Sequence, residues 1–442
     1  MHPLFDRIPS AFIGIPVSVS EALNGLTGKR IRKRPCSTIR EPHQGSAIVF
    51  QSIDKIRIKP IHPVYCAGSR RIRIGAQADI TVEIEDDEDS KFKALFELLD
   101  GSRDVAGVVA EMRSRFPGVS ADDVHDVIAG LDKERLLERS MSTDYDDPQH
   151  PRHRYLSNVN YFSNYGDSAS VRGEFQDRLL QSKVLVLGLG AGGSHIVSHL
   201  ASMGVAKIRA VDYDRVELTN LNRQILYGES DVGSLKTEAG LRRIAEYNST
   251  LDLEFIARKV VSQDDIRDLC DGMDLIVCAI DEPPFVAQLI VNAVAVERGI
   301  PCVFGMSQIT AGRFFTVLPG QSGCMGCLVV HYSLNDPAFS DQFIAFQELE
   351  FKNPTLSFSP DVARLCGMIA SEVARVLTGF LPPMGVGRQV ELNFEDNSTK
   401  ALTEWQRHPE ACPVCGCGVR ERWPIFRYLD ARQARAARAA CA

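Results

Sequence analysis

The sequence has no uninterrupted apolar run of the ~20 residues that a helix needs to span a bilayer. Its N-terminus lacks the charged-then-apolar order of a secretory signal, because Pro9 and Pro16 break its few apolar residues. It also lacks a large charge of either sign, since the formal net charge is −7 over 442 residues. These absences argue against a membrane or secreted protein and against nucleic acid as a partner, so we expect a cytoplasmic protein.

The remaining composition is that of an ordinary globular protein, with 44% apolar and 24% charged residues. The length allows two or three domains with a sizeable core. Of the 12 cysteines, five fall in two clusters, Cys324 with Cys327 and Cys412 with Cys415 and Cys417. A disulfide framework is not expected in a chain of this size, and the clustering favours a metal site over redox chemistry.

The first 175 residues divide by pattern into three segments. Residues 1–44 contain the basic run GKRIRKRP and are predicted to be a solvated, disordered tail, with a docking arm as the alternative. Residues 45–142 alternate apolar and polar residues as strands do, and then show three helical patterns. One pattern is expected to end at Gly101 and another to begin after Ser120. Residues 143–175 are polar and contain proline, which predicts a linker and an arm.

Two further segments complete the chain. Residues 176–425 alternate apolar strands with helices, which predicts a Rossmann-like, doubly wound, mainly parallel sheet of the α/β class. Within this segment, residues 331–360 are polar and are predicted to be irregular. Residues 426–442 are expected to form a small helical or frayed tail. Sheets of this class bind ligands outside the carboxyl ends of their strands.

A glycine pattern follows the first predicted strand of this sheet. Gly188, Gly190 and Gly193 have the GxGxxG spacing between a strand and a helix, which lets the backbone approach a phosphate. A tight structural turn is the alternative. Asp212 ends the next strand, where it can accept hydrogen bonds from ribose hydroxyls, with a turn aspartate as the alternative. The pattern predicts a nucleotide site that NAD, FAD or ATP would fit.

Polar residues further along extend this predicted site. Asn220, Arg223 and Lys236 bring an amide and two cations, which suit the charge that develops when a carboxylate attacks an α-phosphate. Taken singly, each is more typical of a solvated surface. Asp281 follows a later parallel strand, where a carboxylate can hold Mg²⁺ against a triphosphate. A helix N-cap is the alternative for Asp281, and the two roles are compatible.

The paired CxxC motifs predict a structural zinc site. The ligands would be Cys324, Cys327, Cys412 and Cys415, whose thiolates complete a tetrahedron. Cys417 is a competitor for one ligand place. A zinc ion with four protein ligands has no open position, so the predicted role is structural.

In combination, these motifs resemble the ThiF, MoeB and ubiquitin-activating adenylyltransferases. The resemblance rests on GLGAGG, DYDRVELTNLNRQ, VGSLKTE, the aspartate of CAIDEP and the CxxC pairs, and it covers residues 155–420. LYGESDVGSLKTE and LPGQSGCMGC look closest to the peptide-adenylating branch, typified by the microcin C adenylating enzyme. The resemblance implies ATP and Mg²⁺, a homodimer, phosphate contacts for Arg223 and Lys236, and magnesium at Asp281.

The sequence departs from the family's pattern in two places. Members often carry an arginine in RYxRQ or RYxRN that reaches the partner's site, whereas RYLSN has Ser157 there. The alternatives for an arginine that takes its place are Arg152, Arg154 or Arg172. Members that form a thioester or persulfide place a cysteine after the first CxxC. Residues 328–365 contain none and Cys366 falls on the following helix, so a covalent cysteine step is not expected.

The stretch that begins LFELLDGSRD is similar to the PqqD-type winged-helix module, which binds leader peptides. A purely structural N-terminal cap is the alternative. We therefore expect an ATP-dependent enzyme that adenylates a carboxylate of a ribosomally made precursor peptide. The alternatives are adenylation of a ubiquitin-like sulfur carrier ending in Gly-Gly, a non-catalytic leader-binding protein, and an NAD-dependent oxidoreductase.

Overall fold

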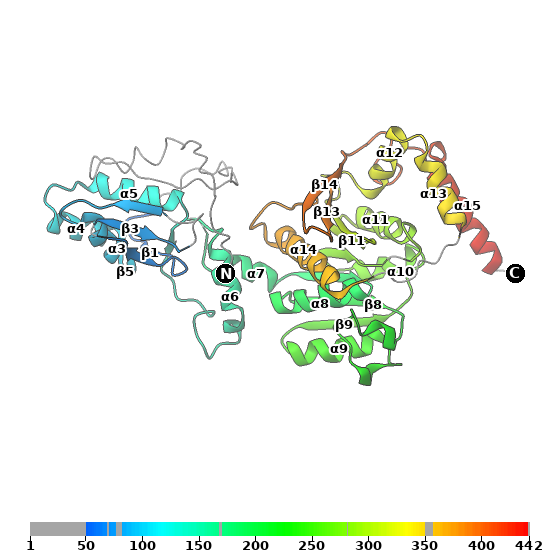
Figure 1. Cartoon of the computed structure of the whole chain (residues 1–442), viewed down its shortest axis with the longest axis horizontal. Helices are drawn as coiled ribbons and strands as arrows, with labels where there is room; N and C mark the ends of the chain where they lie inside the picture. Colours follow the sequence, from blue (N-terminus) through cyan, green and yellow to red (C-terminus); the bar gives the residue numbers. More distant parts are fainter. Residues whose placement is uncertain are drawn as a thin grey trace, which may run out of the picture. The chain divides into compact units, whose positions relative to one another are not determined.

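The structure is a computed structural model, and it describes residues 50–68, 70–76, 82–167, 170–280, 282–349 and 357–440. The predicted tail over residues 1–44 lies outside these ranges. The chain divides into two compact units, the first ending at Glu174 and the second beginning at Phe175 (Figure 1).

In the N-terminal unit, the described residues up to Arg139 form two small antiparallel sheets and three helices. One sheet has the strand order β5-β1-β6 and the other β2-β3-β4. The strands are β1 (Lys55–Ile58), β2 (Val64–Cys66), β3 (Arg71–Ile74), β4 (Val82–Glu85), β5 (Asp100–Asp104) and β6 (Leu137–Arg139). The helices are α3 (Lys91–Leu98), α4 (Val105–Arg115) and α5 (Ala121–Lys133). Strands and helices are thus mixed as predicted, while the winged-helix assignment stays a prediction.

Capping decides one of the predicted helix boundaries in this unit and pairing decides the other. The Ser120 hydroxyl accepts the Asp123 N–H at 3.1 Å and the Asp123 carboxylate accepts the Ser120 N–H at 2.8 Å, so α5 begins where predicted. The predicted helix end at Gly101 is wrong. Helix α3 ends at Leu98, and Gly101 lies inside β5 because the chain passes directly into pairing with β1.

The last part of the N-terminal unit, before its end at Glu174, has helical structure of its own. It contains a 3-10 helix (Pro151–Tyr155) and α6 (Leu156–Ser163). Lys59, of which 2% is exposed, donates from its ammonium group to the carbonyl oxygens of Ser163 at 2.7 Å and Gly166 at 2.8 Å. A buried cation that binds two carbonyls fixes this segment to the rest of the N-terminal unit.

The second unit is built on an eight-stranded sheet with the order β14-β13-β12-β11-β10-β7-β8-β9. The parallel strands are β7 (Lys183–Leu187), β8 (Lys207–Asp212), β9 (Asp252–Ala257), β10 (Leu275–Cys278) and β11 (Cys302–Ser307). The antiparallel strands are β12 (Ala311–Val317), β13 (Arg388–Asn393) and β14 (Thr399–Glu404). The prediction of a mainly parallel α/β sheet is confirmed.

The helices of this unit are α7 (Glu174–Leu179, which begins at the boundary), α8 (Ala191–Met203), α9 (Lys236–Tyr247), α10 (Asp264–Arg267), α11 (Val286–Arg298), α12 (Met325–Asn335), α13 (Phe339–Glu348), α14 (Ser359–Thr378) and α15 (Pro424–Ala440). The irregular structure predicted over residues 331–360 is wrong for much of that range. Helix α13 forms there because Phe339 and Phe343, four residues apart, pack together on its buried side. Among the described residues, no helix is long and apolar enough to cross a membrane.

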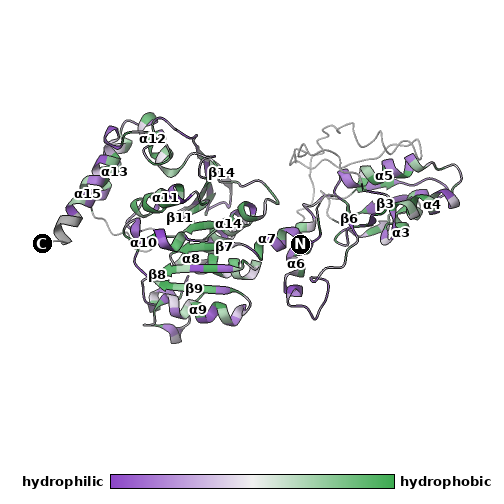
Figure 2. Ribbon diagram, turned by 180° about the vertical axis from the view of Figure 1, so that it is seen from behind, coloured by the Kyte–Doolittle hydropathy of each residue, from purple (hydrophilic) through white to green (hydrophobic). Residues whose placement is uncertain are grey.

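The central strands are buried on both faces. All four residues of β10 and the last four of β7 are buried, and successive side chains of a strand point to opposite faces. Figure 2 shows β7 as hydrophobic, whereas helices such as α9 and α15 carry both hydrophilic and hydrophobic residues. The sheet therefore lies between layers of helices, as in other doubly wound sheets.

Candidate nucleotide site and cysteine cluster

The predicted glycine pattern forms the loop between β7 and α8. Gly188 has a φ of +97°, and a Cβ added to it would lie 2.7 Å from the Ala279 carbonyl oxygen. A Cβ on Gly193 would lie 1.8 Å from the Gly188 carbonyl oxygen. Gly190 is the N-cap of α8, and a Cβ there would meet no atom within 4 Å. Two of the glycines thus permit close packing, and the third leaves open space at a helix N-terminus, where anions bind.

Asp212 and Tyr227 hold this loop from two sides. The Leu189 N–H donates to Asp212 Oδ2 at 2.6 Å, and the Tyr227 hydroxyl donates to the Leu189 carbonyl oxygen at 2.8 Å. Burial, followed by the nearby charges of Asp212 and Asp214, raises the pKa of Tyr227 well above its usual value, so the hydroxyl keeps its proton. Sequence reasoning missed Tyr227, because the residue that it contacts is 38 positions earlier in the chain.

Lys236 lies at the first position of α9 with 5% of its surface exposed. Its Nζ forms an ion pair with Asp214 Oδ2 at 2.8 Å. Asp214 in turn donates its N–H to Asp212 Oδ1 at 2.8 Å. The structure therefore brings Lys236 and Asp212 together through Asp214, which the sequence analysis did not select. The one available signal was the spacing of the two aspartates in DYD.

Asn220 and Arg223 lie in the loop between β8 and α9. The buried Asn220 side chain accepts the Glu217 N–H at 3.1 Å, and the Arg223 N–H donates to the Asn220 carbonyl oxygen at 3.1 Å. The Arg223 guanidinium is partly exposed and donates to the Thr219 carbonyl oxygen at 2.7 Å. The backbone of Arg223 also hydrogen-bonds His195 of α8, whose pKa is lowered by burial. These contacts fix the loop beside the helix that begins at the glycines.

Asp281 lies outside the described residues, so its predicted magnesium role is not placed by the structure. Its N-terminal neighbours are described. The Ala279 N–H donates to the Leu187 carbonyl oxygen at 2.9 Å, and the Gln288 side-chain amide donates to the Ile280 carbonyl oxygen at 3.1 Å. The chain that leads to Asp281 thus runs beside the end of β7, where the glycine loop begins.

The four predicted zinc ligands lie together. The Sγ atoms of Cys324, Cys327, Cys412 and Cys415 all lie within 4.8 Å of one another. Three of the separations are 3.3, 3.7 and 4.0 Å, close to the edge of about 3.8 Å that a tetrahedron of sulfurs at 2.3 Å from zinc requires. The part of the chain that the structure describes contains no other such group of possible ligands.

Backbone N–H groups also point at this cysteine cluster. The His408 N–H donates to Cys327 Sγ at 3.3 Å and the Val414 N–H to Cys412 Sγ at 3.4 Å. Such bonds stabilise thiolates, which are the form that binds zinc. Cys417 is exposed and contacts the Pro409 carbonyl oxygen instead. Its sulfur is not a member of the cluster, so the four paired cysteines fit zinc without it.

The structure also bears on the two departures from the family's pattern. Cys366 is 1% exposed, its thiol donates to the Gly192 carbonyl oxygen at 3.5 Å, and burial raises its pKa to about 12. Such a thiol cannot act as an exposed nucleophile. The Arg172 side chain is 5% exposed and pairs with Asp146 at 3.0 Å inside the N-terminal unit. This burial excludes Arg172 as an arginine offered to a partner, whereas Arg152 and Arg154 are exposed.

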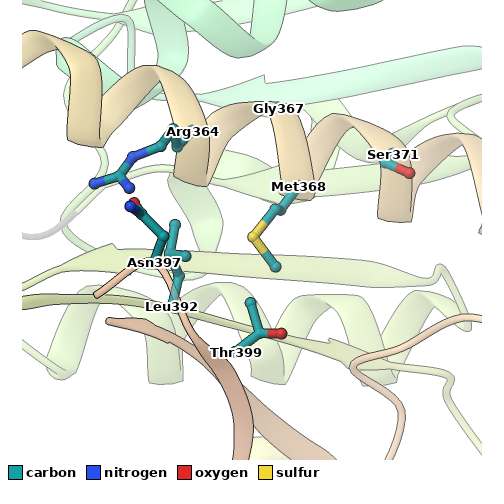
Figure 3. Close-up of a pocket in the computed structure, with 7 residues that line it drawn as sticks. All are labelled: Arg364, Gly367, Met368, Ser371, Leu392, Asn397 and Thr399. Carbon is teal, nitrogen blue, oxygen red and sulfur yellow. The ribbon is translucent and has the colours of Figure 1, made fainter. Parts of the chain in front are cut away.

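A separate hollow of about 690 Å³ lies between α14 and the β13–β14 hairpin (Figure 3). Its lining shares no residue with the predicted site. Met368 and Leu392 give it apolar walls, and Arg364 and Asn397 point toward each other at one end. Helix α14 also contacts Gly192, in the first turn of α8, through Cys366. The open space over Gly190, and not this hollow, lies at a helix N-terminus suited to phosphate.

Comparisons with known proteins show what the chain is similar to. The sequence model described as "ThiF family" matches residues 158–416. The sulfur carrier protein ThiS adenylyltransferase of Bacillus subtilis is 36% identical over 244 residues, which are 54% of this chain and 67% of that protein. The sulfur carrier protein adenylyltransferase of Thermus thermophilus is 30% identical over 248 residues, 55% of this chain and 85% of that protein.

Solved structures give a similar fold over more of the chain. The Escherichia coli protein MccB, crystallised with ATP, matches with a TM-score of 0.65 at 21% identity. The match covers 82% of this chain and 99% of MccB. MccB crystallised with AMPCPP and MccA gives the same values. At this identity the likeness establishes the fold.

Proposed function

The chain belongs to the ThiF family and is an adenylyltransferase, and we propose that its substrate is a carboxylate of a ribosomally made precursor peptide. One observation supports a peptide substrate more than any other. The fold shared with MccB covers 82% of the chain, whereas residues 158–442 make up less than two thirds of it. The likeness to a protein crystallised with the peptide MccA therefore extends into the N-terminal unit.

The proposed reaction joins a carboxylate oxygen to the α-phosphorus of ATP. The bond from the α-phosphorus to the bridging oxygen breaks, pyrophosphate leaves, and the acyl-adenylate forms without any proton transfer. Gly188, Gly190 and Gly193 would let the backbone at the start of α8 approach the phosphates. The positive end of the helix dipole and the free N–H groups would stabilise their charge.

The other predicted residues have distinct proposed roles. Asp212 would bind the ribose hydroxyls with the lone pairs that its two backbone contacts leave available. Arg223 and Lys236 would stabilise charge on the departing pyrophosphate, and Asn220 would hold the loop that carries Arg223. Asp281 would hold Mg²⁺, which neutralises charge on the β- and γ-phosphates when bound. Zinc at the four cysteines would be structural.

We assign leader binding to the N-terminal unit. Strand β2 lies at the edge of its sheet, and Val64, Tyr65 and Cys66 are all exposed. Within the part of the chain that the structure describes, β2 pairs on one side only, with β3. An extended peptide can add to such an edge through main-chain hydrogen bonds. Leader binding at this edge would deliver the core peptide to the adenylation unit.

Adenylation of a ubiquitin-like sulfur carrier is the second candidate, and the names of the sequence relatives favour it. The positions of the cysteines favour a peptide substrate over a sulfur carrier. Cys366 is buried, and no cysteine occurs in residues 328–365, so this stretch offers no thiol for a thioester or persulfide. The adenylate would then be attacked by an amide of the peptide or by an external nucleophile.

We also propose a homodimer in which Arg154 reaches the partner's site in place of the arginine that Ser157 replaces. Mixing the variants Arg154→Ala and Lys236→Met, each of which should retain only weak activity, tests this. One site of each mixed dimer would carry both wild-type residues, so activity should return on mixing. Arg172→Ala is the control, because this arginine is buried in its own unit and its loss should lower stability instead. Failure to regain activity would contradict the contribution in trans.

ATP–pyrophosphate exchange with Mg²⁺ tests the substrate directly. Candidate leader-bearing peptides are compared with a carrier protein that ends in Gly-Gly. Exchange that only a peptide supports, and that is lost when its leader is removed, is the expected result. Exchange that only the carrier supports would replace the proposal with sulfur-carrier activation. Leader binding without exchange from any substrate would indicate a non-catalytic leader-binding protein.

A further inference from the structure

Lys236 and Asp214 form an ion pair beside the glycine loop. The Lys236 side chain is 6% exposed, whereas that of Asp214 is 46% exposed. Among the described residues, Asp214 is the one carboxylate within ion-pair distance of this ammonium group. A buried cation is costly unless it is paired, so Asp214 stabilises Lys236 in its observed position.

The backbone holds the two residues in register. An isolated antiparallel bridge joins Arg215, which follows Asp214, to Leu235, which precedes Lys236. The Lys236 N–H donates to the Asp214 carbonyl oxygen at 2.9 Å. The N–H of Asp214 donates to Asp212 at 2.8 Å, and the other oxygen of Asp212 binds the glycine loop. The position of the Lys236 ammonium is thereby linked to the position of the loop.

We infer that Asp214 is a positioning residue that holds the Lys236 ammonium group toward the transferred nucleotide. The inference rests on the proposed role of Lys236 in adenylation. An ammonium group has three N–H donors, so a bond to Asp214 leaves two for phosphate oxygens. Protein kinases contain a similar arrangement, in which a carboxylate holds the phosphate-binding lysine in place. The Asp214 side chain is 46% exposed, so the ion pair lies at the surface of the unit and not deep in its core.

A competing role for Asp214 predicts a different effect of its removal on ATP binding and on kcat. In the competing role, Asp214 pairs with the Lys236 ammonium only until the triphosphate of ATP takes the place of the carboxylate. Removing the carboxylate would then free the ammonium and strengthen ATP binding. If Asp214 positions Lys236, its loss lets the ammonium shift, and a shift of about 1 Å at a reacting group can cost about 10²-fold in rate. The split between KM for ATP and kcat therefore separates the two roles.

The experiment measures ATP–pyrophosphate exchange for Asp214→Asn, Asp214→Glu, Lys236→Met and the double variant Asp214→Asn with Lys236→Met. The acyl substrate is the peptide or carrier protein that supports exchange by the wild type. We expect Asp214→Asn to lower kcat about 10²-fold, with little change in KM for ATP. Asp214→Glu keeps the carboxylate and should regain part of this loss. Melting temperatures show whether each variant is folded.

The double variant decides whether Asp214 acts through Lys236. A positioning residue has nothing to position in the Lys236→Met background, so the double variant should be no slower than Lys236→Met alone. A further loss in the double variant would overturn the inference, since Asp214 would then act on substrate or metal itself. Unchanged kcat with a lower KM in Asp214→Asn would overturn it in favour of the competing role. If Lys236→Met keeps wild-type exchange, the proposed role of Lys236 fails first.

Discussion

Replacing Gly193 by alanine should disrupt the glycine loop. The new Cβ would lie 1.8 Å from the Gly188 carbonyl oxygen and 2.7 Å from its carbonyl carbon, and Cβ contacts under 3.0 Å essentially never occur. Both atoms are backbone, so no side chain can rotate away. The loop or the start of α8 would have to move by more than about 1 Å, a displacement that at a reacting centre costs about 10²-fold in rate.

The stability cost follows from the same clash. Overpacking of this kind costs about 2 kcal/mol, which lowers the melting temperature of a domain of this size by roughly 4–8 °C. Gly192→Ala is the matched control on the same helix. Its Cβ would meet Ala279 Cβ at 3.9 Å and Cys366 Sγ at 4.0 Å, which are ordinary contacts, and alanine favours the helix. Gly192→Ala should therefore melt at or above the wild-type temperature and retain exchange.

The variant Gly190→Ala separates an effect on ATP binding from an effect on protein packing. A Cβ there would meet no protein atom, and its φ of −68° is open to any residue, so the stability cost should stay below about 1 kcal/mol. If phosphate occupies the space over this N-cap, the added methyl group should raise the KM for ATP. The measurements are thermal melting and ATP–pyrophosphate exchange on all three variants. Wild-type stability and exchange in Gly193→Ala would refute the clash, and an unchanged KM in Gly190→Ala would refute the phosphate position.

Three further predictions follow from other contacts. Chelation, or Cys327→Ser, should remove about one zinc ion per chain and lower the melting temperature, whereas Cys417→Ser should keep both; metal analysis and calorimetry check this. Tyr227→Phe leaves the Leu189 carbonyl oxygen without the hydroxyl that it accepts, so it should cost about 1–3 kcal/mol by chemical denaturation and weaken ATP binding. Burial lowers the pKa of Lys59 from 10.5 to about 8, so the folded chain binds fewer protons than the unfolded chain between these values. Its free energy of unfolding should then rise from pH 8 to pH 10.5, and Lys59→Met should lack this rise in denaturation measured across that range.

The sequence predicted elements whose determinants are local. Ser120 with Asp123 forms a capping box within four residues, and the glycine pattern follows a buried strand directly. The parallel sheet was also predictable, because its strands are continuous apolar runs between helical patterns. Predictions from local patterns were wrong at Gly101, where pairing with β1 ends the helix early. They were also wrong over much of residues 331–360, where α12 and α13 bury apolar side chains against the rest of the unit.

The candidate site could be predicted only in part for the same reason. Glycine spacing and polar residues after parallel strands identified Gly188, Asp212 and Lys236. The contacts that hold them, from Tyr227 to Leu189 and from Asp214 to Lys236, join residues 38 and 22 positions apart. No periodicity records such pairs. Burial is equally invisible in sequence, so only the structure distinguishes the buried Arg172 from the exposed Arg154.

The cysteine cluster has a consequence for how the length of the chain between its two pairs can vary. Cys327 lies near the start of α12 and Cys412 follows β14. A metal held by them would close the chain between them into a loop that contains α13, α14, β13 and the edge strand β14. The entropy of closing a loop grows slowly, by only about 0.6 kcal/mol for each doubling of its length. With its ends fastened, the connections inside this loop can lengthen or shorten at little entropic cost, while Cys366 keeps α14 in contact with Gly192 of α8.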